Sequence, residues 1–202
     1  SPEHPVTSVV VQASLTVPVG LYLLLRSQHL FSHSADAALL ATIVGLGGAC
    51  LMALAAFSAT DMARVLAYST ASQAGLITAA ALTASAWGAV HLVTHSVAKC
   101  ALILGAAVVC RAVTSGGDLA RMGGLRAHLP LAFSAFVVAA MVLSGMPPLF
   151  GFLEHAGMAL AGHVWAQALL GLTFLLTSLY VWRLLWLVFL GKARSTTLRP
   201  AQ

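Results

Sequence analysis

Three titratable residues, His91, His95 and Lys99, recur at every fourth position within an otherwise apolar stretch that runs from Trp87 to Val109. In an α-helix this spacing places the three side chains on one face. At about 1.5 Å of rise per residue the row covers about 12 Å along the helix, so one or two water molecules can join neighbouring groups. Imidazole and amine groups at such separations can take up a proton and pass it on. The row is therefore predicted to be a proton relay.

The position of Lys99 favours a functional role over a structural one. An ionisable side chain within a membrane-spanning helix costs at least about 2.5–3.5 kcal/mol on insertion scales. Lys99 stands near the middle of its apolar stretch, too far from either end for the ammonium to reach the membrane surface comfortably. His91 lies nearer the start, where a histidine at the membrane interface is an equally good explanation. We therefore expect Lys99 to be paired or functional.

The composition is typical of a protein that lies in lipid, with 60% hydrophobic residues, 7% charged residues and a mean hydropathy of +0.95. The net charge of +5 does not indicate nucleic acid, because the basic residues stand singly and form no patch interleaved with aromatic residues. Cys50, Cys100 and Cys110 have no C-x-x-C spacing, which favours packing roles over a disulfide or metal site. The sequence predicts an integral membrane protein surrounded by lipid, without a metal site.

Long apolar segments predict about six transmembrane helices in a single transmembrane domain over residues 1–202. Their expected ranges are about 6–26, 37–59, 63–84, 87–111, 129–160 and 165–190. The short alternating segments of a membrane β-barrel are absent, so an all-α membrane protein is expected. Most Lys and Arg residues fall in loops on one side and only Arg26 on the other, which predicts cytoplasmic termini.

The fifth apolar segment is interrupted by Gly145-Met146-Pro147-Pro148. Prolines lack the backbone N–H and glycine adds conformational freedom, so the helix is expected to break there, near the middle of the membrane. A simple kink is the alternative. Broken helices in transporters face water-filled cavities. Glu154 and His155 follow the break, and Glu154 is the only acidic residue deep within an apolar segment, so both join the predicted relay.

Two other charged positions have structural explanations. Asp61 precedes the third predicted helix and is expected to cap its N-terminus, with Arg64 as an anchor at the membrane surface. Arg183 lies within a turn or two of the end of the last segment, where its guanidinium is expected to extend to the cytoplasmic surface.

Four ordered motifs carry a resemblance to a known family. They are Asp61-Met-Ala-Arg-Val-Leu-Ala-Tyr-Ser-Thr-Ala-Ser-Gln-Ala-Gly75, His91-Leu-Val-Thr-His-Ser-Val-Ala-Lys-Cys-Ala-Leu102, Met122-Gly-Gly-Leu-Arg-Ala-His-Leu-Pro130 and Gly145-Met-Pro-Pro-Leu-Phe-Gly-Phe152. In this order they resemble the antiporter-like proton-pumping subunits, above all the L-type, or subunit 5, member of the membrane arm of complex I. Related subunits of Mrp-type cation/proton antiporters, membrane-bound hydrogenases of the hydrogenase-4 type and bicarbonate-accumulating complexes are alternatives.

The resemblance implies a fold of two inverted repeats, each with one broken helix and a central lysine, of which this chain would cover mostly the second. By motif, Lys99 would be the central proton-holding lysine, and His91 and His95 would be the relay histidines. Polar channel lining would come from Tyr68, Ser69, Thr70, Gln73 and Gln12.

The chain departs from the family pattern at two places. Glu154-His155-Ala156-Gly157 stands where L-type members usually carry Ser-Lys-Asp-Glu, so Glu154 or His155 would replace the exit lysine. Gln12 stands where the family often has a histidine, and an amide cannot exchange protons at physiological pH, so a route through it would need water. In the family a first repeat carries a glutamate and lysine pair for proton uptake, and a separate chain with this repeat is one expected partner.

The implied function is that of a proton-translocating membrane subunit of a complex I-like respiratory NADH:quinone oxidoreductase, in a bacterial cytoplasmic (inner) membrane. The sequence has no Rossmann glycine pattern and no cysteine cluster, so NADH, FMN, Fe–S clusters and quinone are expected only on partner subunits. A cation/proton antiporter subunit would instead show Na⁺ or K⁺ dependence without NADH or quinone. A non-pumping structural paralogue would tolerate the loss of Lys99.

Overall fold

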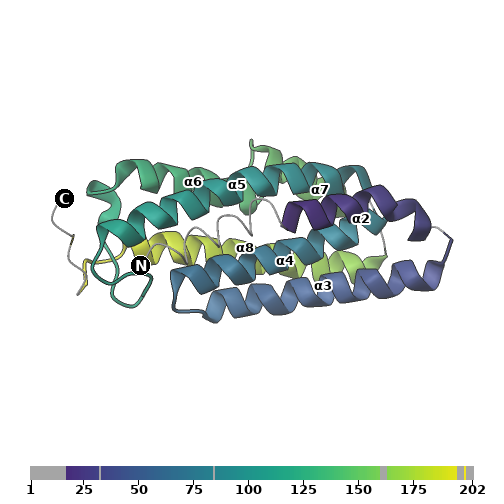
Figure 1. Ribbon diagram of the computed structural model, residues 1–202, viewed down its shortest axis with the longest axis horizontal. Coiled ribbons are helices and arrows are strands. Elements are labelled where there is room, and N and C mark those ends of the chain that lie inside the picture. Colours follow the sequence, from purple (N-terminus) through teal and green to yellow (C-terminus); the bar gives the residue numbers. More distant parts are fainter. Residues whose placement is uncertain (1–16, 32, 84, 160–162, 195–197, 199–202) are drawn as a thin grey trace.

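The computed structural model describes residues 17–31, 33–83, 85–159, 163–194 and 198, and its regular elements are helices that run along one long axis (Figure 1). They are α2 (Val17–Phe31), α3 (Ala35–Ser58), α4 (Met62–Thr83), α5 (Ser85–Ala112), η2 (Leu125–Ala127), α6 (Pro130–Leu143), α7 (Phe150–Ala159), α8 (Val164–Leu185) and the π-helical turn η3 (Trp186–Leu190). The expected all-α membrane fold is confirmed.

Among the described residues, four helices are long and apolar enough to cross a membrane: α3, α4, α5, and α8 together with η3. They correspond closely to the expected segments 37–59, 63–84, 87–111 and 165–190. The segment expected at 6–26 begins outside the described residues, and its helix α2 continues to Phe31. The number of six spans is therefore not confirmed, although each of the other five expected segments contains helix.

The expected interruption of the fifth segment is present, because α6 ends at Leu143 and α7 begins at Phe150. Gly145 has a φ of 66°, in the left-handed region that favours glycine. A Cβ atom at this position would also overlap the ring of His155. The turn between the two half-helices thus packs directly against a residue of the predicted relay.

Close backbone packing between α3 and α4 fixes the position of α4. A Cβ atom on Gly75 would overlap the carbonyl oxygen of Gly45 and crowd Ala49, so the two helices approach at residues without bulk. Ser72 Oγ also donates a hydrogen bond of 2.9 Å to the Ala49 carbonyl oxygen. This contact matters for the site because Ser69 and Gln73 stand on the same helix α4.

The ends of α3, α4 and α8 are joined by polar contacts near the expected membrane surface. The Arg64 backbone N–H donates to Asp61 Oδ1 at 3.1 Å, so Asp61 caps α4 as expected. Arg183 Nη1 donates to the Ala59 carbonyl oxygen at 3.0 Å, and its guanidinium carbon lies 5.7 Å from the centre of the Phe57 ring. Arg183 therefore binds the residue that follows α3 at this end of the bundle, and its extension to the cytoplasmic surface stays a prediction.

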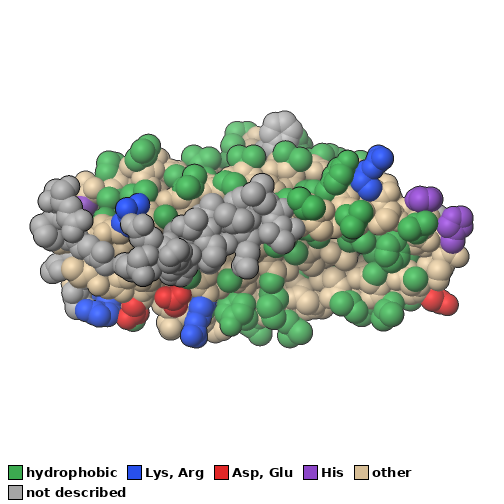
Figure 2. Space-filling view, viewed as in Figure 1, with side chains coloured by type: hydrophobic (Ala, Val, Ile, Leu, Met, Phe, Trp, Pro, Cys, Tyr) green, Lys and Arg blue, Asp and Glu red, His purple; other side chains and the backbone are tan. Residues whose placement is uncertain are grey.

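The outer surface is apolar along much of its length. Figure 2 shows hydrophobic side chains over the middle of the visible face, with the charged side chains of the described residues toward the two ends. Large apolar residues such as Val44 and Leu51 on α3 and Leu131 on α6 are exposed. A surface of this kind suits contact with lipid or with neighbouring membrane subunits.

Candidate functional site

The five residues of the predicted relay are all buried in the bundle. Their relative exposures are 1% for His91, 6% for His95, 1% for Lys99, 1% for Glu154 and 9% for His155. The histidine row and Lys99 stand on α5, and the other two residues stand on α7. His91 is thus enclosed by the helices around it and does not lie on the outer surface of the bundle.

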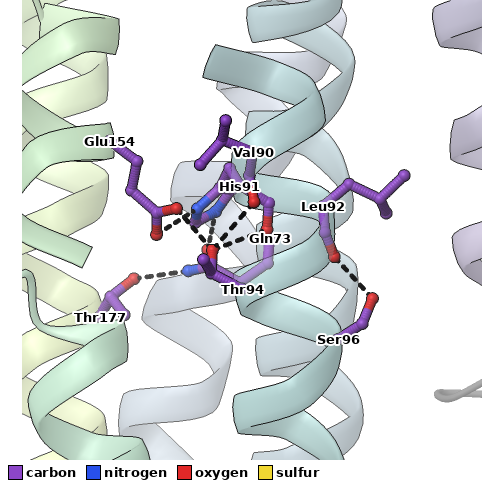
Figure 3. Close-up of polar contacts among 8 residues, drawn as sticks. All are labelled: Gln73, Val90, His91, Leu92, Thr94, Ser96, Glu154 and Thr177. Atoms are coloured by element: carbon purple, nitrogen blue, oxygen red, sulfur yellow. Dashed lines mark hydrogen bonds and ion pairs between the residues drawn. The ribbon is translucent and has the colours of Figure 1, made fainter. Parts of the chain in front are cut away.

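Glu154 of α7 is held by two residues of α5. Its Oε1 lies 3.0 Å from His91 Nδ1, and its Oε2 accepts a hydrogen bond of 2.5 Å from Thr94 Oγ1. Figure 3 shows the carboxylate directed at these two side chains, which lie on one face of α5. Residues at i and i+3 of a helix are neighbours on its surface, so one carboxylate can contact both.

The opposite edge of the His91 ring faces α4. His91 Nε2 lies 2.8 Å from Gln73 Oε1, and Gln73 Nε2 donates to Thr177 Oγ1 at 3.1 Å (Figure 3). Because the Gln73 amide nitrogen is directed at Thr177, the Gln73 oxygen faces His91 and requires a hydrogen on His91 Nε2. The network therefore fixes which ring nitrogen carries a hydrogen: Nε2 is protonated.

This arrangement leaves a single proton to be shared between His91 Nδ1 and Glu154 Oε1. When the proton is on the nitrogen, the pair is an imidazolium and a carboxylate. When it is on the oxygen, both partners are neutral. At 3.0 Å the two atoms are within hydrogen-bond distance, so the proton can pass between them without movement of either helix. The pair can thus store a proton and release it.

Lys99 lies further along α5 and binds α4. Its Nζ donates to the Leu66 carbonyl oxygen at 2.7 Å and to Ser69 Oγ. The hydroxyl groups of Ser69 and Thr70 also donate to the Leu66 carbonyl oxygen, at 3.1 and 2.9 Å. Both acceptors of the ammonium group are uncharged, and no described carboxylate forms an ion pair with it. The lysine is therefore held by dipoles alone.

His95 lies between these two clusters. Its ring centre is 6.0 Å from that of His91, and its Nδ1 is buried with no hydrogen-bond partner among the described residues. The hydroxyl of Tyr180 on α8 lies beside Ser69 and Thr177, and it too lacks a partner at hydrogen-bonding geometry. Buried polar atoms without partners are uncommon in proteins and are often found at functional sites.

The structure does not bring every expected residue to the site. Tyr68 is 36% exposed and lines an outer groove with Ser58, Thr60 and Arg64, away from the buried row. Thr70 lies on the buried side of α4, and its hydroxyl bonds back to its own helix. Gln12 lies outside the described residues. Pro147 and Pro148 stand in the turn between α6 and α7.

Three residues of the site were not among the expected ones: Thr94, Thr177 and Tyr180. A signal for two of them exists in the sequence, since Thr173, Thr177 and Tyr180 are spaced by four and three positions in an apolar segment. This spacing puts a polar stripe on one face of α8. Thr94 lies within the motif that carries the histidines and could not be singled out by spacing alone.

His155 completes a group that has the chemistry of a metal site. Its ring centre is 5.8 Å from that of His91 and 3.7 Å from that of Phe174. One possible ligand atom from each of His91, Glu154 and His155 lies within 4.8 Å of the others. Within the described part of the chain, His155 Nε2 is buried and has no hydrogen-bond partner.

Comparisons with known proteins point to one family. A family model described as "NADH:quinone oxidoreductase/Mrp antiporter, TM" matches residues 3–180. The chain is 36% identical over 195 residues to NADH-quinone oxidoreductase subunit L of Escherichia coli K12, covering 92% of this chain and 31% of that protein. It is 34% identical over 192 residues to NADH-ubiquinone oxidoreductase chain 5 of Cryphonectria parasitica, covering 91% of this chain and 29% of that protein. The chain thus spans less than a third of the length of these relatives.

Two solved structures show the same fold. A chain of the Mrp complex from Dietzia sp. DQ12-45-1b matches with a TM-score of 0.82 and 23% identity, over 91% of this chain and 36% of that one. A chain of an archaeal respiratory complex, the membrane-bound sulfane sulfur reductase, matches with a TM-score of 0.83 and 22% identity, over 94% of this chain and 41% of that one. These relatives and structural neighbours are subunits of multisubunit membrane complexes.

Proposed function

Because this chain belongs to the NADH:quinone oxidoreductase/Mrp antiporter transmembrane family, we propose that it carries protons in the membrane arm of a complex I-like NADH:quinone oxidoreductase. The complex would lie in a bacterial cytoplasmic membrane, with other membrane-arm subunits as partners and the redox cofactors on further subunits. The names of the relatives from Escherichia coli and Cryphonectria parasitica support this choice among the complexes of the family. The match covers about a third or less of each of these relatives.

The proton path begins at the Glu154 and His91 pair. A proton taken up on the carboxylate passes across 3.0 Å to His91 Nδ1, which makes the ring an imidazolium. The imidazolium then holds a second proton on Nε2, directed at Gln73. Release of the bond to Gln73 frees this proton for His95, whose Nδ1 is buried and has no partner. Gln73 thus controls the step from the first cluster to the second.

The path continues from His95 to Lys99, one helical turn further along α5. A neutral amine at Lys99 accepts the proton, and the resulting ammonium donates to the Leu66 carbonyl oxygen and to Ser69. Neutral acceptors stabilise the ammonium without binding it as tightly as a carboxylate would. The proton can therefore leave again when a charge nearby changes.

The observation that carries the proposal is the burial of Lys99 with no carboxylate partner among the described residues, in the same row as His91, which shares a proton with Glu154. A subunit with only a structural role gains nothing from such a lysine, because an apolar residue of similar volume is less costly in this environment.

The test replaces Lys99 with methionine, which has a similar length but cannot hold a proton. In the assembled complex, we expect the Lys99→Met variant to lose proton translocation while NADH oxidation and the subunit content are kept. Translocation is measured by the quench of a pH-sensitive dye in inverted vesicles. The matched control is Lys192→Met, because Lys192 is exposed beyond the end of η3. An unaltered ratio of protons to electrons in Lys99→Met would contradict the proposal, and a requirement for Na⁺ or K⁺ would favour cation/proton exchange.

A further inference from the structure

The geometry around Glu154 points to a second capability of the site. One nitrogen of His91, one carboxylate oxygen of Glu154 and one nitrogen of His155 lie within 4.8 Å of one another. Two imidazoles and one carboxylate are the protein ligands of many zinc sites in which the fourth position is left to water. We propose that His91, Glu154 and His155 bind a Zn²⁺ ion.

The distances are close to those that a zinc ion needs. With Zn–N and Zn–O bonds of about 2.0–2.1 Å, neighbouring ligand atoms of a tetrahedral site lie about 3.3 Å apart. His91 Nδ1 and Glu154 Oε1 are already 3.0 Å apart. His155 stands next to Glu154 on α7, and its ligand atom lies within 4.8 Å of those of His91 and Glu154. A change in its side-chain torsion angles that shortens this separation toward about 3.3 Å would complete the three ligands. No described residue forms a competing hydrogen bond with the buried His155 Nε2.

The residues around these three form hydrogen bonds of the kind that hold the ligands of known metal sites in place. A histidine that binds a metal usually donates its other N–H to an acceptor, which fixes the ring. Gln73 Oε1 has this role at His91 Nε2, at 2.8 Å, and leaves Nδ1 for the ion. Thr94 holds Glu154 Oε2 at 2.5 Å and leaves Oε1 for the ion. Thr177 in turn orients Gln73.

Zinc at this position would occupy the place of the proton shared by His91 and Glu154. The ion would therefore stop proton movement at the first step of the path. This consequence rests on the proposed function, whereas binding of zinc does not. The two can be measured separately.

The first experiment measures zinc in the purified complex that contains this chain, after incubation with zinc chloride and removal of free metal. The complex with the parent chain should hold one more zinc ion than the complex with His155→Ala. The dissociation constant of this ion should rise more than about 100-fold in His155→Ala, because loss of an outer partner alone weakens metal binding by about 10–100-fold. Equal zinc content in the two complexes would overturn the proposal.

The control removes an exposed histidine pair. His29 and His33 lie at the end of α2, with ring centres 6.4 Å apart, and could bind zinc at the surface. The double variant His29→Ala/His33→Ala should retain the tightly bound ion. Loss of that ion in the double variant would overturn the assignment to His91, Glu154 and His155.

Cobalt provides a spectroscopic test on the parent complex, so the proposal can be tested even if His155→Ala does not assemble. Co²⁺ in a four-coordinate site with nitrogen and oxygen ligands absorbs visible light far more strongly than six-coordinate Co²⁺. We expect the strong bands in the parent complex and weaker affinity, by about 10–100-fold, in Thr94→Val, which keeps all three ligands. Only weak six-coordinate bands in the parent complex would overturn the site.

Zinc titration of proton translocation then separates the two proposals. Inhibition that follows occupancy of the site supports both. Zinc binding with unaltered translocation would overturn the proton path through Glu154 and leave the metal site standing. Absence of zinc binding would overturn the metal site and leave the proton path standing.

Discussion

Glu154 Oε1 lies 3.0 Å from His91 Nδ1, although the two residues are 63 positions apart and stand on different helices. The contact depends on the break between α6 and α7, because the turn at Gly145 packs against His155, the neighbour of Glu154. A buried carboxylate beside an imidazole is a pair that can hold one proton in two places. The position of this pair on the same row as Lys99 is the basis of the predictions below.

Replacement of Glu154 by glutamine tests the shared proton. The amide can accept from Thr94 with its oxygen and donate to His91 Nδ1 with its nitrogen, so the contacts seen in the structure are kept. The amide cannot give up a proton, however. We expect the rate of proton translocation in Glu154→Gln to fall at least about 100-fold, the usual loss when a positioned acid–base group is removed. A rate within twofold of the parent rate, in a complex with normal subunit content, would show that the path avoids Glu154.

Thr177 tests whether the orientation of Gln73 matters. Thr177→Val keeps the shape of the side chain but removes the oxygen that accepts from Gln73 Nε2. The amide can then rotate and direct its nitrogen at His91 Nε2. The His91 hydrogen would then have to move from Nε2 to Nδ1. We expect slower proton translocation and a loss of about 1–3 kcal/mol in stability, because one polar atom of the buried amide lacks a partner in either orientation.

The matched variant Thr177→Ser retains the hydroxyl and should translocate protons at close to the parent rate. Translocation is followed in inverted vesicles, and stability is followed by thermal unfolding of the purified complex. Equal rates for the valine and serine variants would show that the Gln73 orientation has no role in the path.

Substitution of His95 is expected to affect proton translocation but not stability. Its buried Nδ1 has no partner in the described structure, and replacement of such a group by an apolar one of similar size is often neutral or stabilising. We therefore expect His95→Leu to unfold at the parent temperature or above it, yet to lose most proton translocation. A parallel loss of stability and transport would instead indicate that His95 has a packing role.

Gly145 tests the link between the helix break and the site. Gly145→Ala combines the cost of a left-handed conformation, about 1–2 kcal/mol, with an overlap between the new Cβ and the His155 ring. Gly116 has a similar φ of 61° but open space around it, so Gly116→Ala carries the conformational cost alone. We expect Gly145→Ala to lower proton translocation and Gly116→Ala to leave it unaltered, as measured in inverted vesicles. Equal transport in the two variants would mean that the turn does not position α7.

Much of the fold was predictable because each long helix is a continuous apolar run. The expected segments for α3, α4, α5 and α8 agree closely with the structure, and Pro147 and Pro148 identified the turn after α6. Periodicity also identified the buried row on α5, because residues four positions apart share a helix face whatever the other helices do.

The partners of that row could not be predicted in the same way. Contacts between helices depend on how α4, α5, α7 and α8 rotate and shift against one another, and apolar runs do not encode this. Tyr68 and Ser69 are adjacent in sequence and equally polar, yet one faces the outer groove and the other accepts from Lys99. Thr94 and Thr177 became visible as parts of the site only through their contacts with Glu154 and Gln73.

The distribution of the site over the chain has a consequence for biosynthesis. The acceptors of Lys99, Leu66 and Ser69, precede it by 33 and 30 residues, so α4 is already made when the lysine enters the membrane. Glu154 follows His91 by 63 residues, which at about 5–20 residues per second takes about 3–13 s of translation. The α4–α5 hairpin can therefore satisfy its lysine at once, whereas His91 must wait in the membrane for its carboxylate until α7 has been inserted.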